Sequence, residues 1–216
     1  MPTTTAPDAV ARYESGVRKF RAGDVNGALA DYLEALHLNP DYAEAYYGRG
    51  NVRFRQRNLA AAHEDYSKAI ALRPDFADAY NNRSVVRCAR HDYNGAISDA
   101  SKAIRLQPDD ADPYYNRARA KAQLGNYGGA IRDLSTAIKL RPDFVDAYLM
   151  RAINRQRSGN YVGAVEDATT AITLAPQRAG TYLLRANLRL SARNYRGALA
   201  DLLAAIRIRL GQMSHR

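Results

Sequence analysis

The chain has few of the residues from which catalytic and metal sites are usually built. It contains one cysteine and four histidines among 216 residues. The single cysteine, Cys88, excludes an internal disulfide and a cysteine-based zinc cluster, and it suits a reducing compartment. The histidines occupy unrelated positions, and no glycine-rich phosphate loop occurs. We therefore expect a protein that is not an enzyme and that holds no metal or other cofactor.

Long apolar stretches are also missing. Residues 1–8 are rich in Thr and Pro, with neither a basic start nor an apolar segment. This composition predicts no signal peptide and no membrane span. We expect a cytoplasmic protein whose residues 1–8 form a flexible tail, because nothing in them can bury a core.

Acidic residues are scarce in the later part of the sequence. Residues 1–110 hold 15 Lys/Arg and 15 Asp/Glu, whereas residues 111–216 hold 17 and 7, so the net charge of +10 arises there. Such asymmetry can mark a surface for acidic proteins, nucleic acid or anionic lipid. A solubilising surface explains it equally well, and the composition leaves both interpretations open.

Repetition is what the sequence has in abundance. The phrase Pro-Asp-Tyr-Ala-Glu-Ala-Tyr from Pro40 returns in varied form from Pro74, Pro108, Pro142 and Pro176, at a spacing of 34 residues without insertion. A fixed period in this range predicts a stacked repeat architecture. We define six repeats that form a single array over residues 9–212 and leave a tail at 213–216: 9–42, 43–76, 77–110, 111–144, 145–178 and 179–212.

Each repeat is predicted to form two helices. Counting Ala43 as position 1, position 8 is always small and positions 20 and 27 are always Ala. Small residues mark the line along which two helices approach closely. Position 16 is always Asp or Asn and position 33 is often Asp, so both are expected to cap a following helix. Position 15 is Gly in three repeats, whereas Arg57, His91 and Arg193 stand there in the others at some energetic cost.

The pattern resembles the tetratricopeptide repeat (TPR) in all six repeats. The matching features are an aromatic at position 4, the small residue at 8, Ala at 20 and 27, an aromatic at 24 (Tyr32, Tyr66) and Pro at 32. The resemblance implies an all-α fold, a right-handed superhelical solenoid of six antiparallel helix pairs. It also implies that the first helices line a concave groove that binds protein or peptide. Arg12 at position 4 and a basic residue at every position 11 depart from the family pattern.

A ladder of charges runs through the repeats. Position 7 is Arg in five repeats, position 11 is always basic and position 23 is always Asp. Positions 7 and 11 lie one turn apart on the face that looks toward the second helix. We infer a structural Arg–Asp bridge inside each of five repeats, although the surplus of cations could instead hold phosphate or carboxylate groups. The predicted pairs are Arg49–Asp65, Arg83–Asp99, Arg117–Asp133, Arg151–Asp167 and Arg185–Asp201.

The resemblance also assigns the groove. Positions 2, 5, 6, 9, 12 and 13 of the first helix face it in the family, and here these positions vary between repeats, as a ligand-reading surface should. Tyr offers a rigid surface, Asn can pair with an extended peptide backbone, and Arg can bind a carboxylate. The candidate groove residues are Tyr13, Tyr47, Asn51, Phe54, Arg55, Asn81, Asn82, Tyr115, Asn116, Arg119 and Arg157.

These observations predict a non-catalytic interaction scaffold that binds a peptide or partner helix, with acidic partners suited to the basic region. The alternative is nucleic-acid or anionic-surface binding through residues 111–216, although aromatics for base stacking are not concentrated there. The last helix is unusually apolar, with Leu203 in place of Ser or Thr and Leu210 in place of Pro. It would leave an uncovered strip, for which we expect weak self-association or docking of a second protein.

Overall fold

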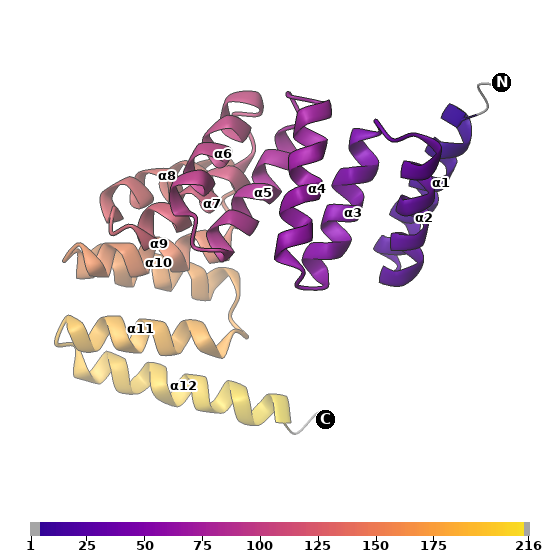
Figure 1. Ribbon diagram of the computed structural model, residues 1–216. Helices are drawn as coiled ribbons and strands as arrows, with labels where there is room; N and C mark the ends of the chain where they lie inside the picture. Colours follow the sequence, from indigo (N-terminus) through magenta and orange to yellow (C-terminus); the bar gives the residue numbers. More distant parts are fainter. Residues whose placement is uncertain (1–4, 214–216) are drawn as a thin grey trace. The chain divides into compact units, whose positions relative to one another are not determined.

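The computed structural model describes the backbone of residues 5–213 and the side chains of residues 7–210. Within this range the chain forms twelve α-helices and no strand (Figure 1). No helix in this range is long and apolar enough to cross a membrane. The helices are α1 (Thr5–Arg21), α2 (Val25–Leu38), α3 (Ala43–Arg55), α4 (Leu59–Leu72), α5 (Ala77–Ala89), α6 (Tyr93–Leu106), α7 (Ala111–Gln123), α8 (Tyr127–Leu140), α9 (Val145–Arg157), α10 (Tyr161–Leu174), α11 (Ala179–Ser191) and α12 (Tyr195–Met213).

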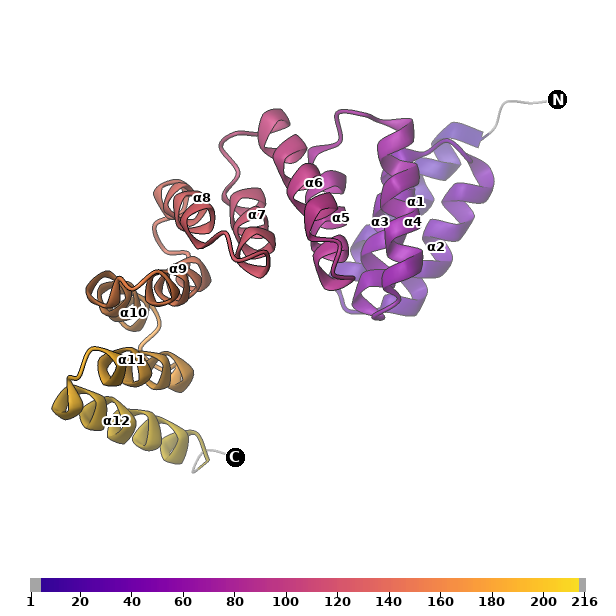
Figure 2. The same cartoon turned by 60° about the vertical axis from the view of Figure 1, so that its left-hand side comes forward.

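The helices divide into two compact halves, residues 1–108 and 109–216, which we describe separately. In the N-terminal half, α2 packs against α1 and α3, and α4 packs against α3 and α5. In the C-terminal half, α8 packs against α7 and α9, and α10 packs against α9 and α11 (Figure 2). Helices α2, α4, α8 and α10 are therefore each covered by the first helix of the following repeat. The all-α class and the paired-helix architecture predicted from the 34-residue period are confirmed.

The two terminal helices extend beyond the predicted repeats. Helix α1 begins at Thr5, so residues 5–8 are helical and not part of a tail. Pro7 lies in the first turn, where proline is tolerated, and Asp8 lies near the positive end of the helix dipole. Helix α12 continues to Met213 because Leu210 stands where proline ends the second helix of the other repeats. Residues 1–4 and 214–216 lie outside the described range.

The caps predicted at position 16 for the second helix of each repeat are present in the structure, whereas those predicted at position 33 for the first helix are not. All six second helices begin after Asp or Asn at position 16, whose side chain accepts from the backbone N–H three residues later. The first helices are not capped by Asp at position 33, because the cap residue is at position 34. There Tyr42, Phe76 and Phe144 make no side-chain cap. Their rings instead lie against the tyrosine at position 5.

The turns inside three helix pairs hold a non-glycine residue in the left-handed conformation. Arg57, His91 and Arg193 have φ of 63°, 64° and 59°. Gly23, Gly125 and Gly159 occupy the same position in the other repeats at φ of 87°, 74° and 81°. A left-handed backbone brings Cβ close to the following carbonyl oxygen, so the three non-glycine turns are strained.

Arg57→Gly is expected to stabilise the protein by about 1 kcal/mol, because the left-handed conformation costs a non-glycine residue about 1–2 kcal/mol and glycine recovers most of it. Urea denaturation followed by circular dichroism would measure the gain. Gly125→Ala is the matched control, and we expect a loss of about 1 kcal/mol there. Unchanged stability in both variants would contradict the strain.

Candidate functional site

A buried carboxylate inside each repeat binds two cations. Asp65 accepts from Arg49 Nη2 at 2.7 Å and from Arg53 Nη1 at 3.0 Å. The structure brings together every predicted ladder pair, and each position-11 cation binds the same Asp. The Arg–Asp distances in the remaining repeats are 2.8 Å for Arg83–Asp99, 2.8 Å for Arg117–Asp133, 2.7 Å for Arg151–Asp167 and 2.6 Å for Arg185–Asp201.

The ladder is part of the protein interior. In the first repeat, which has no arginine at position 7, Asp31 accepts from Lys19 and Ser15. Burial raises the pKa of Asp31, but these hydrogen bonds and the nearby positive charges outweigh burial and hold the pKa below its usual value. Both cations of a repeat bind one buried carboxylate, so their charged groups already have a partner inside the protein. The geometry favours the structural interpretation.

Ladder arginines also join neighbouring repeats. Arg83 donates to Ser67 Oγ at 3.1 Å, Arg151 donates to Ser135 Oγ at 3.0 Å, and Arg185 donates to Thr169 Oγ1 at 3.1 Å. These hydroxyl groups occupy position 25 of the preceding repeat. The contact fixes how one repeat stacks on the next.

A polar network crosses from the second repeat to the third in the N-terminal half. Asn82 Nδ2 donates to Tyr47 Oη at 3.1 Å and to Asn51 Oδ1 at 2.9 Å. Tyr66 Oη also donates to Asn51 Oδ1, at 2.8 Å. The structure thus brings together three of the predicted groove residues and adds Tyr66, which the sequence analysis had used only as the aromatic at position 24 of the repeat pattern. We call Tyr47, Asn51 and Asn82 the asparagine cluster.

The side chains of the asparagine cluster are joined to one another through their amide groups. Asn51 Oδ1 accepts two hydrogen bonds and Asn82 Nδ2 donates two, and further side-chain hydrogen bonding joins Tyr47 to Asn51 and Tyr66 to Asn82. Both asparagine side chains are half-buried and held by the bonds above. Burial raises the pKa of Tyr47 and of Tyr66. The phenols therefore remain neutral hydrogen-bonding groups at physiological pH.

An aromatic pair lies beside the cluster. The rings of Tyr47 and Phe76 are 4.9 Å apart, and the Arg73 guanidinium lies 3.5 Å from the centroid of Phe76. Arg73 also donates to Glu44 Oε1 at 2.6 Å. The planar guanidinium and the ring form a rigid stack, since cation–π and ion-pair contacts hold the same group.

The C-terminal half repeats this arrangement. Tyr115 and Phe144 are 4.9 Å apart, Arg141 lies 4.5 Å from the Phe144 centroid, and Arg141 bonds Asp112 at 2.9 and 3.0 Å. Hydrogen bonding to Asp112 raises the pKa of Arg141. The sequence analysis missed both phenylalanines. The available signal was that Arg at position 31 and Phe at position 34 occur together in the second and fourth repeats.

The other predicted groove residues lie outside the asparagine cluster, and each has its own surroundings. Tyr13 lies 5.2 Å from Tyr42 and 5.9 Å from Tyr32. Phe54 is exposed, and Arg55 lies over the Phe20 ring at 5.4 Å. Arg157 lies over the Tyr127 ring at 5.4 Å. The half-buried remainder comprises Asn81, Asn116 and Arg119.

First helices of the C-terminal half expose aliphatic side chains that the groove prediction left out. Ile153 on α9 and Leu183 and Leu190 on α11 are exposed. They occupy positions 9, 5 and 12, which the family pattern assigns to the groove. Hydrophobicity at these positions was the signal, but the prediction favoured polar and aromatic residues. The candidate surface thus differs in chemistry between the halves.

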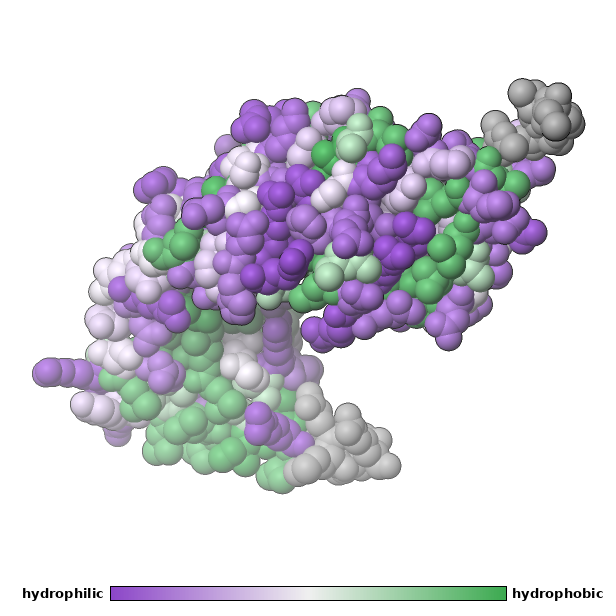
Figure 3. All heavy atoms as spheres, in the orientation of Figure 1, coloured by the Kyte–Doolittle hydropathy of each residue, from purple (hydrophilic) through white to green (hydrophobic). Residues whose placement is uncertain are grey.

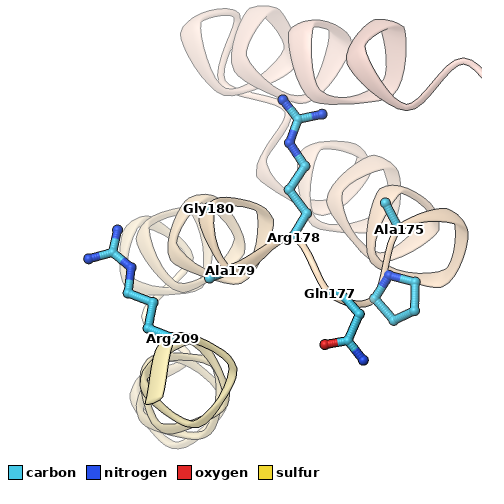
Figure 4. Close-up of a pocket in the computed structure, with 7 residues that line it drawn as sticks. Ala175, Gln177, Arg178, Ala179, Gly180 and Arg209 are labelled. Carbon is cyan, nitrogen blue, oxygen red and sulfur yellow. The ribbon is translucent and has the colours of Figure 1, made fainter. Parts of the chain in front are cut away.

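A pocket in the C-terminal half lies between the turn that precedes α11 and the side chain of Arg209 (Figure 4). It is lined by residues 175–180 and Arg209. Arg178 leaves the turn and pairs with Asp146 at 2.7 Å. No lining residue is an acid, a histidine or a cysteine, so we do not take this pocket as the candidate site.

Comparison with known families agrees with the repeat pattern. Models described as tetratricopeptide repeat or TPR repeat match residues 16–57, 43–76 and 88–155. Among curated protein sequences, none matches this chain.

Solved structures with the same fold include the three proteins that follow. PilW, a type IV pilus biogenesis factor, has a TM-score of 0.83 at 20% identity, with 89% of this chain and 90% of PilW covered. PilF of Pseudomonas aeruginosa has a TM-score of 0.82 at 20% identity, with 94% and 92% covered. YrrB, a TPR protein with an unusual peptide-binding site, has a TM-score of 0.67 at 22% identity, with 84% and 94% covered. At these identities the likeness establishes the fold alone.

Proposed function

Because the chain belongs to the tetratricopeptide repeat family, we propose that it is a non-catalytic interaction scaffold that binds an extended peptide segment of another protein. The asparagine cluster of α3 and α5 is the central contact. The observation that carries the proposal is that the side-chain amides of Asn51 and Asn82 are bonded side by side on the first helices of adjacent repeats. An amide has both donors and an acceptor, and an extended peptide backbone offers one C=O and one N–H at each residue.

The neighbouring ring of Tyr47 would hold a side chain of the peptide. Tyr47 is half-buried next to the cluster, and the buried ring of Phe76, with Arg73 and Glu44 beside it, holds it in place. Preformed polar and aromatic groups reduce the ordering cost of binding. The backbone contacts would supply affinity, and the aromatic surface would supply selectivity for the side chain.

The basic region favours protein over nucleic acid as the ligand, because many of its cations already bind carboxylates. Of the 17 Lys/Arg between residues 111 and 216, eight bind carboxylates in the structure. A phosphate at these cations would compete with the carboxylates that they already bind. The proposal includes that the protein is cytoplasmic and that it prefers acidic peptides.

The test begins with 12-residue peptides selected from a random library on the full-length protein, with fluorescence anisotropy to measure affinity. The double variant Asn51→Ala with Asn82→Ala should weaken binding about 10- to 100-fold, because two hydrogen bonds of about 1 kcal/mol each are lost. Asn94→Ala, an exposed change on α6, is the matched control and should leave affinity unchanged.

Retention of full affinity by the double variant would contradict the assignment of the asparagine cluster. Salt provides a second comparison. Affinity should change little between 50 and 500 mM salt for a peptide held by hydrogen bonds and aromatic contact, whereas phosphate binding falls steeply over that range. A steep fall would favour nucleic acid.

A further inference from the structure

Helix α12 carries an apolar stripe on the side that faces away from its own repeat. Its members are between 39% and 59% exposed, and Figure 3 shows hydrophobic surface gathered over this helix. At 3.6 residues per turn, they fall within an arc of about 100°, the width of a helix-packing face. The α12 stripe consists of Leu199, Leu202, Leu203, Ile206 and Leu210.

The same face of the other second helices in this half is covered by a helix. Leu134 and Ile138 of α8 stand at the positions of Leu202 and Ile206, and both are buried in a core that includes Ala147 of α9. Ala168 of α10 is likewise buried with Leu188 of α11. The α12 stripe therefore lies where this architecture places a packed helix.

The occupant is not another repeat of the same kind. Ser135 and Thr169 each accept a hydrogen bond from the ladder arginine of the following repeat. Leu203 replaces that hydroxyl in α12, so an arginine arriving there would face an aliphatic side chain without a hydrogen-bond partner.

A second copy is also a poor fit. On α1, Glu14 and Arg18 stand where α3 buries Gly48 and Val52 against the preceding helix. Stacking α1 of one copy on α12 of another would press these exposed charges onto leucines. Pairing two α12 helices would bring together two sets of arginines.

The charges around the α12 stripe indicate the chemistry of its occupant. Arg196 and Arg207 lie along one edge and Arg209 along the other, and all three are exposed. Asp201, the acidic residue of the described part of α12, is buried and bonded to Arg185 and Arg189. Both edges of the stripe are thus positive, and they complement a ligand with negative edges.

We propose that the α12 stripe is the docking site for an amphipathic α-helix of another protein that carries apolar residues at three- and four-residue spacing and Asp or Glu along both edges. The helix would cover α12 as α9 covers α8. The 19 residues of α12 span about 28 Å, which matches a partner helix of about five turns. This site is separate from the asparagine cluster and does not depend on the proposed function.

The test uses two fluorescent 20-residue helical peptides with the same leucine stripe, one with glutamates and one with lysines along both edges. Anisotropy with the full chain should show at least tenfold tighter binding of the glutamate peptide. Leu203→Ser with Leu210→Ser should weaken that binding at least tenfold. Val162→Ser, at an apolar residue of α10 that is 72% exposed, should not change it. Arg207→Glu with Arg209→Glu should reverse the preference between the peptides.

Several results would overturn the proposal. Equal affinity for the two peptides would indicate unspecific adhesion, and undiminished binding by the serine variant, with its melting curve unchanged, would place the peptide elsewhere. Sedimentation that shows a dimer abolished by the serine changes would make a second copy the occupant. Binding to phosphatidylserine vesicles that requires the same leucines, without peptide binding, would make the occupant a membrane surface.

Discussion

Asp167→Ala is expected to lower the free energy of unfolding by about 3 kcal/mol, the lower end of the range for breaking a buried ion pair. Asp167 is 3% exposed. It accepts from Arg151 Nε at 3.0 Å, from Arg151 Nη2 at 2.7 Å and from Arg155 Nη1 at 2.9 Å. Removing the carboxylate leaves two cations close together in a site with little access to water.

The loss is not expected to be larger because both arginines keep other partners. Arg151 still donates to Ser135 Oγ at 3.0 Å, and Arg155 still donates to the carbonyl oxygen of Gly163 at 2.9 Å. A ladder can contribute little net stability and still be costly to break, because desolvation offsets attraction in the intact pair but one-sided removal leaves charge uncompensated.

Asp146→Ala in the same repeat is the matched control. Asp146 pairs with Arg178 at 2.7 Å, but both side chains are about half exposed, at 52% and 50%. A surface pair of this kind contributes about 0–1 kcal/mol. Urea denaturation followed by circular dichroism should therefore separate the two variants, and equal midpoints would refute a structural role for the ladder.

The 34-residue period was enough to predict the ladder. Positions 7 and 11 are one turn apart, position 23 lies on the opposing helix, and their charges are opposite in every repeat from the second onward. Because Arg151, Arg155 and Asp167 lie within one helix pair, their contact could be predicted without knowing how the repeats stack. The caps after position 16 could be predicted for the same reason, since a cap involves residues three apart.

The asparagine cluster could not be predicted as a bonded unit. Asn51 and Asn82 are 31 residues apart and lie on different repeats, so their contact depends on how α3 and α5 are set against α4. The positions themselves were identified through the family resemblance. Phe76 was missed because its position was expected to follow a capping Asp, whereas its ring packs on Tyr47. Contacts between repeats depend on packing, which period alone does not encode.

A second large effect is expected at Gly50, where helix propensity and packing predict opposite signs. Alanine is favoured over glycine in a helix by about 1 kcal/mol. However, a Cβ at Gly50 would lie 2.7 Å from Cε1 and 2.9 Å from Cδ1 of Tyr66, and Tyr66 is fully buried. We expect Gly50→Ala to destabilise the protein by about 2 kcal/mol, because overpacking a filled core costs about 1–3 kcal/mol.

The repeats themselves contain the compensating change. Where position 24 is Tyr, as in Tyr32 and Tyr66, position 8 is Gly, and where position 24 is Ala or Leu, position 8 is Ser or Ala. Leu134 in the fourth repeat is fully buried against Ala118. Ala118 and Leu134 therefore show how the same helix pair packs when position 24 holds no aromatic ring.

A double-mutant cycle tests this coupling. Tyr66→Leu alone should destabilise, since it removes ring contacts and the hydrogen bond to Asn51. Gly50→Ala added to Tyr66→Leu should no longer cost stability and should add about 1 kcal/mol, because the alanine then has room and improves helix propensity. The coupling energy from urea denaturation should be about 2–3 kcal/mol in favour of the double variant.

Gly180→Ala, where no atom lies within 4 Å of the added Cβ, is the control for helix propensity and should stabilise the protein. Additive losses at Gly50 and Tyr66 would show that the ring does not limit the size of the residue at position 8.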